Sequence, residues 1–204
     1  MIKDKKYVGN KPIVISLEGI DGAGKTTLIN LLSSRLGNSV VVYSRCKKSA
    51  FVKKVLSFRF IKKIRIIQLP IYVFLANRNY KSIEKSIDEN TKVVLMDRCF
   101  LSNICYYLPL TMHCNPLFQL LMLTEPPIIP EKIFIVDVDP EVAMERDNYS
   151  KAFDWYVSAN NNYKKAFNSK SFQKYGIEIL KESLTVGGKV DYIFSYIRNR
   201  NNCI

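Results

Sequence analysis

The feature that most constrains this chain is a glycine-rich turn between an apolar run and a helical pattern. Residues 13–27 read IVISLEGIDGAGKTT, which contains the spacing GxxxxGK[ST] from Gly19 to Thr26. The apolar residues before the turn predict a buried strand, and the apolar residues of 28–32 fall on one face of a helix. A strand, a glycine turn and an amphipathic helix in this order are typical of a phosphate-binding loop in an α/β protein.

The residue types in this turn suit the binding of a nucleoside triphosphate. Glycines allow the backbone angles and the close approach that aim N–H groups at phosphate oxygens, next to a helix N-terminus. Lys25 is expected to reach the β- and γ-phosphates, and the Thr26 hydroxyl is expected to ligate Mg²⁺. We therefore predict that ATP is bound by the residues of the turn: Gly19, Ile20, Asp21, Gly22, Ala23, Gly24, Lys25, Thr26 and Thr27.

Composition favours one globular domain over residues 1–204. Hydrophobic residues make up 48% of the chain and charged residues 24%, as in folded rather than disordered proteins. No apolar run approaches the roughly 20 residues that span a bilayer, and the N-terminus lacks the apolar segment of a signal peptide. The five cysteines are odd in number and form no CxxC pair, which indicates reduced thiols in a cytosol rather than a disulfide framework or a zinc site. We expect a cytoplasmic protein with no membrane partner.

The formal net charge of +13 suits anionic partners such as nucleotides. Eight Lys and Arg residues lie in 47–65, interleaved with apolar residues at helical spacing. A solvated basic helix face is the default interpretation, and a nucleic-acid surface is the alternative. We do not expect nucleic acid to be a partner. His113, the single histidine, is interpreted as structural rather than as a catalytic base.

Apolar, β-branched segments alternate with helical patterns along the chain. Strands are predicted at 12–17, 40–43, 92–96, 132–138 and 177–180, and helices at 25–36, 49–58, 71–88, 101–108, 141–147, 153–168 and 188–199. Strands that are apolar throughout are buried on both faces, so this pattern predicts a three-layer α/β fold with a five-stranded parallel sheet flanked by helices. In such a fold ligands bind at the carboxyl ends of the strands.

The third predicted strand ends in Asp97-Arg98, a pair that fits this edge of the sheet. A carboxylate beside the phosphate-binding loop can hold Mg²⁺ directly or through water. A guanidinium beside it can bind phosphate through two hydrogen bonds. The alternative interpretation is an ordinary surface ion pair.

Several segments, taken in order, resemble the thymidylate kinases. They are the loop of 18–27, Phe74 to Arg78, Asp97-Arg98 with Ser102 and 105–107, Pro130-Glu131 with 136–141, and 153–156 with Tyr163. This resemblance covers nearly the whole chain. It implies a single P-loop kinase domain over 1–204, with a monophosphate-binding region at about 45–80 and a short lid at about 142–153. It also implies a homodimer.

The resemblance implies transfer of a phosphoryl group from ATP–Mg²⁺ to a deoxynucleoside monophosphate, with dTMP as the first choice. Phe74 would stack on the base, Arg78 would donate to the base O4, and Tyr106 would fill the space of a ribose 2′-hydroxyl. Asp21 would meet the sugar 3′-hydroxyl, and Arg45 and Arg98 would hold the acceptor phosphate. The implied acceptor-binding set is Asp21, Arg45, Phe74, Arg78, Arg98, Ser102 and Tyr106. Core packing for Phe74 and ordinary salt bridges for the arginines stay open.

The chain also departs from the family pattern. Arg45 is followed by Cys-Lys-Lys, so an acidic contact near the acceptor is missing, and the lid is short. Gly22 stands where some thymidylate kinases have an arginine, which implies that the lid supplies the cation, Arg146 first and Lys151 second. The expected catalytic set is Lys25, Asp97, Arg98 and Arg146, and the expected metal set is Thr26 and Asp97. The alternatives are another nucleotide or nucleoside acceptor, a nucleic-acid-associated ATPase, and a paralogue without useful turnover.

Overall fold

A computed structural model describes residues 11–44, 86–107 and 129–201. The predictions for Arg45, Phe74, Arg78 and the basic run of 47–65 lie outside these ranges, as do the predicted helix of 49–58 and most of the helix of 71–88.

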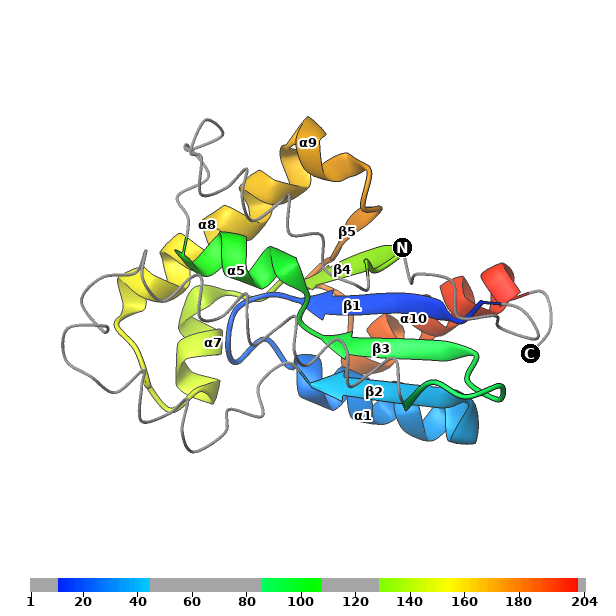
Figure 1. The fold of residues 1–204 in the computed structure, drawn as a ribbon. Coiled ribbons are helices and arrows are strands. Elements are labelled where there is room, and N and C mark those ends of the chain that lie inside the picture. The colour runs from blue at the N-terminus through cyan, green and yellow to red at the C-terminus, as the bar shows by residue number, and fades with distance from the viewer. Residues whose placement is uncertain (1–10, 45–85, 108–128, 202–204) are drawn as a thin grey trace, which may run out of the picture.

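Five parallel strands form a single sheet in the order β2-β3-β1-β4-β5 (Figure 1). Their bounds are β1 Ile13–Glu18, β2 Val40–Ser44, β3 Val93–Asp97, β4 Lys132–Val136 and β5 Ile177–Leu180. In the central strand, Leu17 is level with Asp97 of β3 and with Phe134 of β4. The predicted five-stranded parallel sheet is confirmed.

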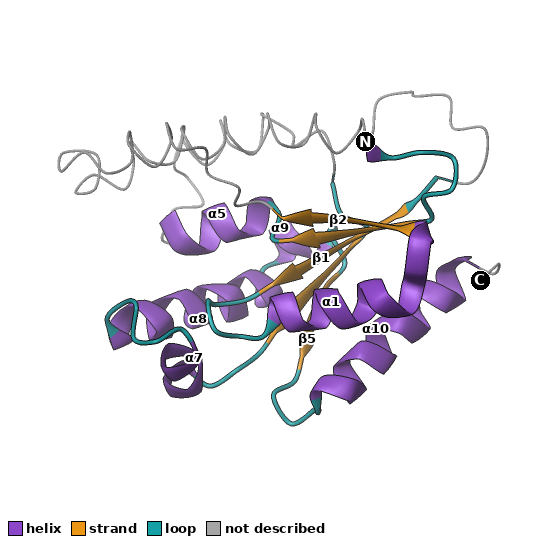
Figure 2. Ribbon diagram, turned by 90° about the horizontal axis from the view of Figure 1, so that it is seen from below, coloured by secondary structure: helices purple, strands orange, loops and turns teal. Residues whose placement is uncertain are grey.

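Helices cover both faces of the sheet. They are α1 Lys25–Leu36, α5 Phe100–Tyr107, α7 Pro140–Arg146, α8 Phe153–Asn168, α9 Lys170–Gln173 and α10 Val186–Asn201, with a 3₁₀ turn, η1, at Gly37–Ser39. Helices α1 and α10 lie side by side on one face, whereas α5 lies on the opposite face and packs against α8 (Figures 1 and 2). Within the described ranges, no helix has both the length and the apolarity to cross a bilayer.

Two helices differ from the sequence expectation for local reasons. Helix α10 begins two residues before the predicted start at 188, because the Thr185 hydroxyl caps it by accepting from the Gly188 amide at 3.1 Å. The single-turn α9 is too short to show a helical period, and its buried Phe172 anchors it to the core.

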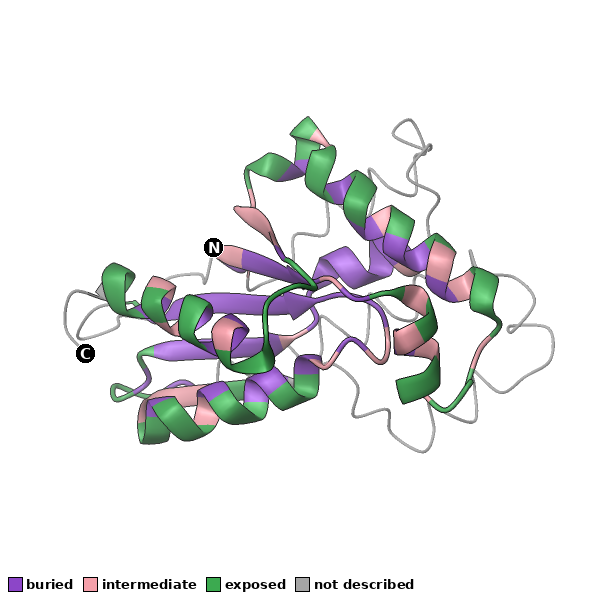
Figure 3. Ribbon diagram, turned by 180° about the vertical axis from the view of Figure 1, so that it is seen from behind, coloured by how far each residue is buried: buried purple, intermediate pink, exposed green. Residues whose placement is uncertain are grey.

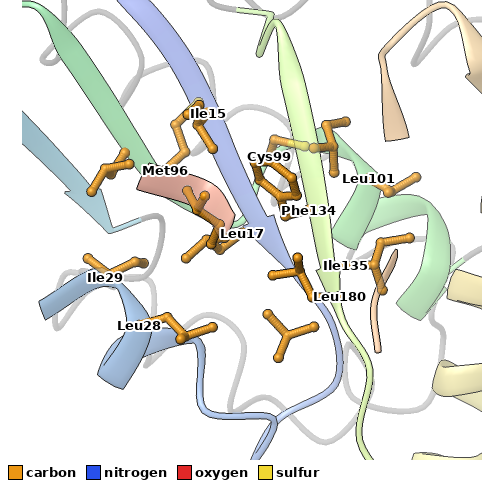
Figure 4. Close-up of a cluster of buried hydrophobic side chains, with 14 of the residues drawn as sticks. Ile15, Leu17, Leu28, Ile29, Met96, Cys99, Leu101, Phe134, Ile135 and Leu180 are labelled. Atoms are coloured by element: carbon orange, nitrogen blue, oxygen red, sulfur yellow. The ribbon is translucent and has the colours of Figure 1, made fainter. Parts of the chain in front are cut away.

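The core lies where the central strands meet the helices. Strands β1, β3 and β4 are buried almost along their full length, as Figure 3 shows, whereas the edge strand β5 is only half-buried. Leu28 and Ile29 of α1 lie on one side of β1 (Figure 4). Helix α5 contributes Leu101 to the same core. Burying each such side chain contributes about 1.5–3 kcal/mol. This core fixes the carboxyl ends of β1 and β3, where the polar residues gather.

Candidate active site

The phosphate-binding loop connects β1 to α1, and two of its glycines are required by close packing. Gly22 has a φ of +80°, and a Cβ there would lie 2.0 Å from the carbonyl oxygen of Ala143 in α7. Gly19 has a φ of +131°, and a Cβ there would lie 2.7 Å from the carbonyl oxygen of Val136. A side chain at either position would push α7 or β4 away from the loop.

Lys25 is buried at the first position of α1 and points back into the loop. Its Nζ donates to the carbonyl oxygen of Ile20 at 2.7 Å, and the same oxygen accepts from the Ala23 amide at 3.3 Å. Burial and the nearby charge of Arg98 lower the pKa of Lys25 to about 7, against the attraction of neighbouring carboxylates. The adjacent Thr26 is exposed to solvent. The loop therefore encloses the amino group of Lys25.

Arg98 joins the end of β3 to the loop. Its backbone has a φ of +74°, a conformation that few non-glycine residues adopt, and its amide donates to the carbonyl oxygen of Leu17 at 3.1 Å. Its buried guanidinium donates from Nη1 to the carbonyl oxygen of Gly19 at 2.7 Å and from Nη2 to Asp21 Oδ1. Strained backbone of this kind clusters at functional sites, where the surroundings hold it in place.

Glu18, the last residue of β1, holds residues that contact the Arg98 guanidinium. Its fully buried carboxylate accepts from the Cys99 amide at 2.6 Å, from the Tyr163 hydroxyl at 2.9 Å and from the Ser102 hydroxyl. The Ser102 and Tyr163 hydroxyls in turn lie 3.2 and 3.3 Å from Arg98 Nη1. One buried carboxylate thus positions α5 and α8 around the guanidinium.

Asp97 offers the carboxylate that a metal ion would need. Burial raises its pKa, although the charges of Arg98 and Lys25 act in the opposite direction. In the part of the chain that the structure describes, its buried Oδ1 has no hydrogen-bond partner. The same ranges hold no group of three or more side chains that could bind a metal ion. The unpartnered oxygen of Asp97 is the kind of hard ligand that Mg²⁺ prefers.

The segment between α7 and α8, where the sequence predicts a lid, contacts the phosphate-binding loop through Lys151. Its Nζ lies 2.5 Å from Asp21 Oδ2 and 3.4 Å from Asp147 Oδ2. Asp21 is therefore paired with both Lys151 and Arg98. Burial would raise the pKa of Asp21, but the two cations together with Lys25 hold it below its ordinary value.

Arg146, the last residue of α7, lies in a more exposed position than Lys151. It is exposed, and its charge acts on Lys189 of α10, whose pKa is lowered by burial and by this like charge. The Lys189 Nζ donates to the carbonyl oxygen of Asp137 at 3.4 Å. Of the two lid cations considered from the sequence, Lys151 is the one that contacts the loop in this structure.

Tyr106 of α5 completes the site beside Arg98. Its hydroxyl donates to the carbonyl oxygen of Gly19 at 3.1 Å. Its ring stacks on Trp155 of α8, with centroids 5.0 Å apart and planes inclined by 23°. Tyr106 therefore touches both the phosphate-binding loop and the helix that follows the lid.

Comparisons with known proteins identify relatives of this chain. The family model described as thymidylate kinase matches residues 17–186. A thymidylate kinase from Nautilia profundicola is 31% identical over 156 residues, which cover 72% of this chain and 79% of that protein. The chain belongs to the thymidylate kinase family. A probable thymidylate kinase from Archaeoglobus fulgidus is 30% identical over 140 residues, which cover 66% of this chain and 68% of that protein.

Solved structures support the fold. A thymidylate kinase from Ehrlichia chaffeensis superposes with a TM-score of 0.66 at 19% identity, over 92% of this chain and all of that chain. A deoxyadenosine kinase from M. mycoides reaches a TM-score of 0.64 at 14% identity over the same shares. At these identities the likeness concerns the P-loop kinase fold alone.

Membership of the thymidylate kinase family makes the chain a nucleoside monophosphate kinase, a phosphotransferase. The family, the fold and the enzyme class predicted from the sequence are confirmed, and a nucleic-acid-associated ATPase is not favoured. The structure brings together the predicted residues of the loop with Asp97, Arg98, Ser102 and Tyr106.

Sequence reasoning missed the supporting residues of this thymidylate kinase site. The pattern marks Glu18 as the start of the loop motif but does not reveal it as the buried acceptor for three donors. A carboxylate that ends a buried strand is a signal that could have pointed to it, because such a group must find partners. The contacts of Tyr163 and Trp155 depend on the packing of α8 on α5, which no sequence pattern specified.

Proposed function

We propose that this protein transfers the γ-phosphoryl group of ATP–Mg²⁺ to dTMP, giving dTDP and ADP. The observation that carries this proposal is the position of Arg98. Its guanidinium hydrogen-bonds to the carbonyl oxygen of Gly19 and pairs with Asp21, both in the phosphate-binding loop. A side chain proposed to hold the acceptor phosphate thus lies beside the site of the donor phosphates.

The reaction needs two anions to approach each other, so positive charge must be preorganised between them. Lys25 and Arg98 both donate to backbone carbonyl oxygens of the loop, and both side chains are buried. Buried cations stabilise the charge of the transferring group more strongly than exposed ones, because water screens them less. No covalent intermediate is required.

On the donor side, we assign ATP to residues 19–27, with Thr26 and Asp97 as the residues that would hold Mg²⁺. The ion, when bound, would neutralise charge on the β- and γ-phosphates. The unpartnered Oδ1 of Asp97 supports this assignment.

On the acceptor side, we assign Arg98, Asp21, Ser102 and Tyr106 from the described site. Asp21 is held by Arg98 and Lys151 at the mouth of the loop, where a sugar 3′-hydroxyl would meet it. The roles of Arg45, Phe74 and Arg78 rest on the family resemblance: phosphate contact, base stacking and donation to the base O4.

A cation from the lid completes the proposed catalytic set of Lys25, Asp97 and Arg98. Arg146 is the first choice from the sequence, and in the structure it is exposed at the end of α7. Lys151 already lies 2.5 Å from Asp21, so the geometry favours Lys151 in this role. Closure of the lid over bound ATP would expel water and strengthen the contact.

We also propose that the protein acts as a cytoplasmic homodimer. The homodimer follows from the family resemblance. The location follows from the odd number of cysteines without a CxxC pair, and the buried thiols of Cys99 and Cys105 support it. Light scattering of the purified protein at several concentrations measures the oligomeric state. A monomer at all concentrations would contradict the dimer.

The reaction is tested by measuring ADP release from ATP–Mg²⁺ with a panel of acceptors: dTMP, dUMP, dCMP, thymidine and none. We expect the highest kcat/KM with dTMP and a poor reaction with dCMP, because its exocyclic amino group would face the Arg78 donor. A preference for thymidine would indicate a nucleoside kinase. ADP release that needs no acceptor and increases with nucleic acid would indicate an ATPase. ATP binding without turnover would indicate an inactive paralogue.

A further inference from the structure

Trp155, the single tryptophan of the chain, links the lid to the acceptor side of the site. It is half-buried in the first turn of α8, four residues after Lys151. Its ring stacks on Tyr106 at 5.0 Å and meets Tyr156 edge-on at 5.1 Å. The Lys151 Nζ lies 4.1 Å from the centroid of the same ring. Trp155 therefore contacts the lid cation and the sugar-facing tyrosine at once.

The stack on Trp155 is one of several contacts that hold the Tyr106 side chain. Tyr106 is half-buried near the end of α5, and its hydroxyl donates to the carbonyl oxygen of Gly19. Its ring lies 5.1 Å from the Arg98 Cζ and meets Tyr163 edge-on at 5.9 Å. The hydrogen bond holds only the tip of the side chain. The Trp155 ring, nearly parallel to that of Tyr106, adds a face-to-face contact that opposes tilting of the ring.

Rejection of a ribose depends on such a limit. A 2′-hydroxyl adds one oxygen atom, so the group that excludes it must be held to within about 0.5 Å. A tyrosine ring that can tilt would make room for that atom at little energetic cost. The discrimination therefore depends on the residue that holds the ring as well as on Tyr106 itself.

We propose that Trp155 is a positioning residue that fixes the Tyr106 ring and thereby restricts the acceptor to deoxyribonucleotides. This inference rests on the proposed function, in which Tyr106 occupies the 2′-hydroxyl space. The indole packs against the edge of the core, whereas the buried Tyr156, Ala159 and Tyr163 supply the core-facing side of this helix. The indole also contacts Lys151 of the lid and Tyr106 of α5.

The test compares dUMP with UMP, which differ only in the 2′-hydroxyl. The ratio of their kcat/KM values is measured for the wild type, Trp155→Leu and Trp155→Phe. An aromatic pair contributes about 2- to 12-fold to an equilibrium. We expect Trp155→Leu to lower the dUMP preference about tenfold, mainly by lowering KM for UMP, and Trp155→Phe to keep most of it. Phe167→Leu is the control, since Phe167 is an exposed aromatic of the same helix, 38% accessible.

A double-mutant cycle separates positioning from general packing. In a Tyr106→Leu background, adding Trp155→Leu should leave the dUMP-to-UMP ratio unchanged, because the ring to be held is gone. An equal loss of selectivity in both backgrounds would overturn the proposal. If the wild type prefers dUMP, an unchanged dUMP-to-UMP ratio in Trp155→Leu would also overturn the proposal. The proposed function would stand in that case. A wild type inactive with every monophosphate would overturn both.

Discussion

At the scale of single residues, the site is a set of charges that hold one another in place before any substrate binds. The Lys25 side chain is enclosed by its own loop. Arg98 is held by the carbonyl oxygen of Gly19 and by the hydroxyls of Ser102 and Tyr163, which also bind the Glu18 carboxylate. Preorganised groups of this kind stabilise a transition state without having to reorganise during the reaction.

Removal of the Lys25 ammonium tests the donor side. Lys25→Ala should lower kcat/KM for phosphoryl transfer by at least about 10²–10³, the usual effect of losing one preorganised electrostatic contact. The fold should persist, which circular dichroism can establish. Near-normal turnover in this variant would contradict the role given to the lysine.

The lowered pKa of Lys25, about 7, makes ATP binding dependent on pH. Above that pH the empty loop holds a largely neutral amine, and the bound phosphates favour its protonated form. ATP binding should therefore take up nearly one proton at about pH 8. Calorimetry in two buffers of different ionisation enthalpy measures this uptake. It should vanish in Lys25→Arg, whose guanidinium stays charged; equal uptake in both proteins would contradict the assignment.

At the scale of elements, the loop and α7 fit together only because Gly22 lacks a Cβ. Gly22→Ala would place a methyl group 2.0 Å from the carbonyl oxygen of Ala143. Gly24 is a matched control, because its φ of +84° is similar but nothing lies within 4 Å of the point where its Cβ would stand. Gly24→Ala should cost about 1–2 kcal/mol of unfolding free energy, the strain of the left-handed conformation, and Gly22→Ala distinctly more. Urea denaturation without nucleotide measures both, and equal losses would contradict the packing argument.

The lid is the second element whose role can be measured. Lys151→Ala should lower kcat at least about tenfold, because it removes a charge beside the phosphates, whereas Arg146→Ala should have a smaller effect. Steady-state kinetics with varied ATP separates kcat from KM. A loss of about 10³ in Arg146→Ala with a mild Lys151→Ala would restore Arg146 as the lid cation. Losses below about fivefold in both variants would remove the lid from the proposed catalytic set.

Much of the element layout could be predicted from the sequence, because buried strands and amphipathic helices have strong periods. All five strands and the helices that begin near Lys25, Phe100, Pro140 and Phe153 are where the pattern places them, within about two residues. The positive φ of Arg98 and the contacts of Glu18 could not be predicted. They arise from packing between β1, β3, α5 and α8, which are distant in sequence.

At the scale of the whole molecule, the parallel sheet places the ends of β1 and β3 next to each other, and the chemistry follows from that neighbourhood. Leu17 and Asp97 are register partners, so the residues after each of them, Glu18-Gly19 and Arg98-Cys99, contact one another. The loop that binds the donor and the arginine proposed for the acceptor come together for this reason. Ligand sites at the carboxyl ends of parallel strands are a general property of such sheets.

The most direct measurement of the central claim is the fate of the γ-phosphoryl group. The wild-type protein is incubated with Mg²⁺, dTMP and ATP labelled at the γ-phosphate, and the products are separated by anion-exchange chromatography. We expect the label to appear in dTDP in a one-to-one ratio with ADP, and we expect Lys25→Ala to lose this transfer. Label found in inorganic phosphate, with or without dTMP, would contradict the claim.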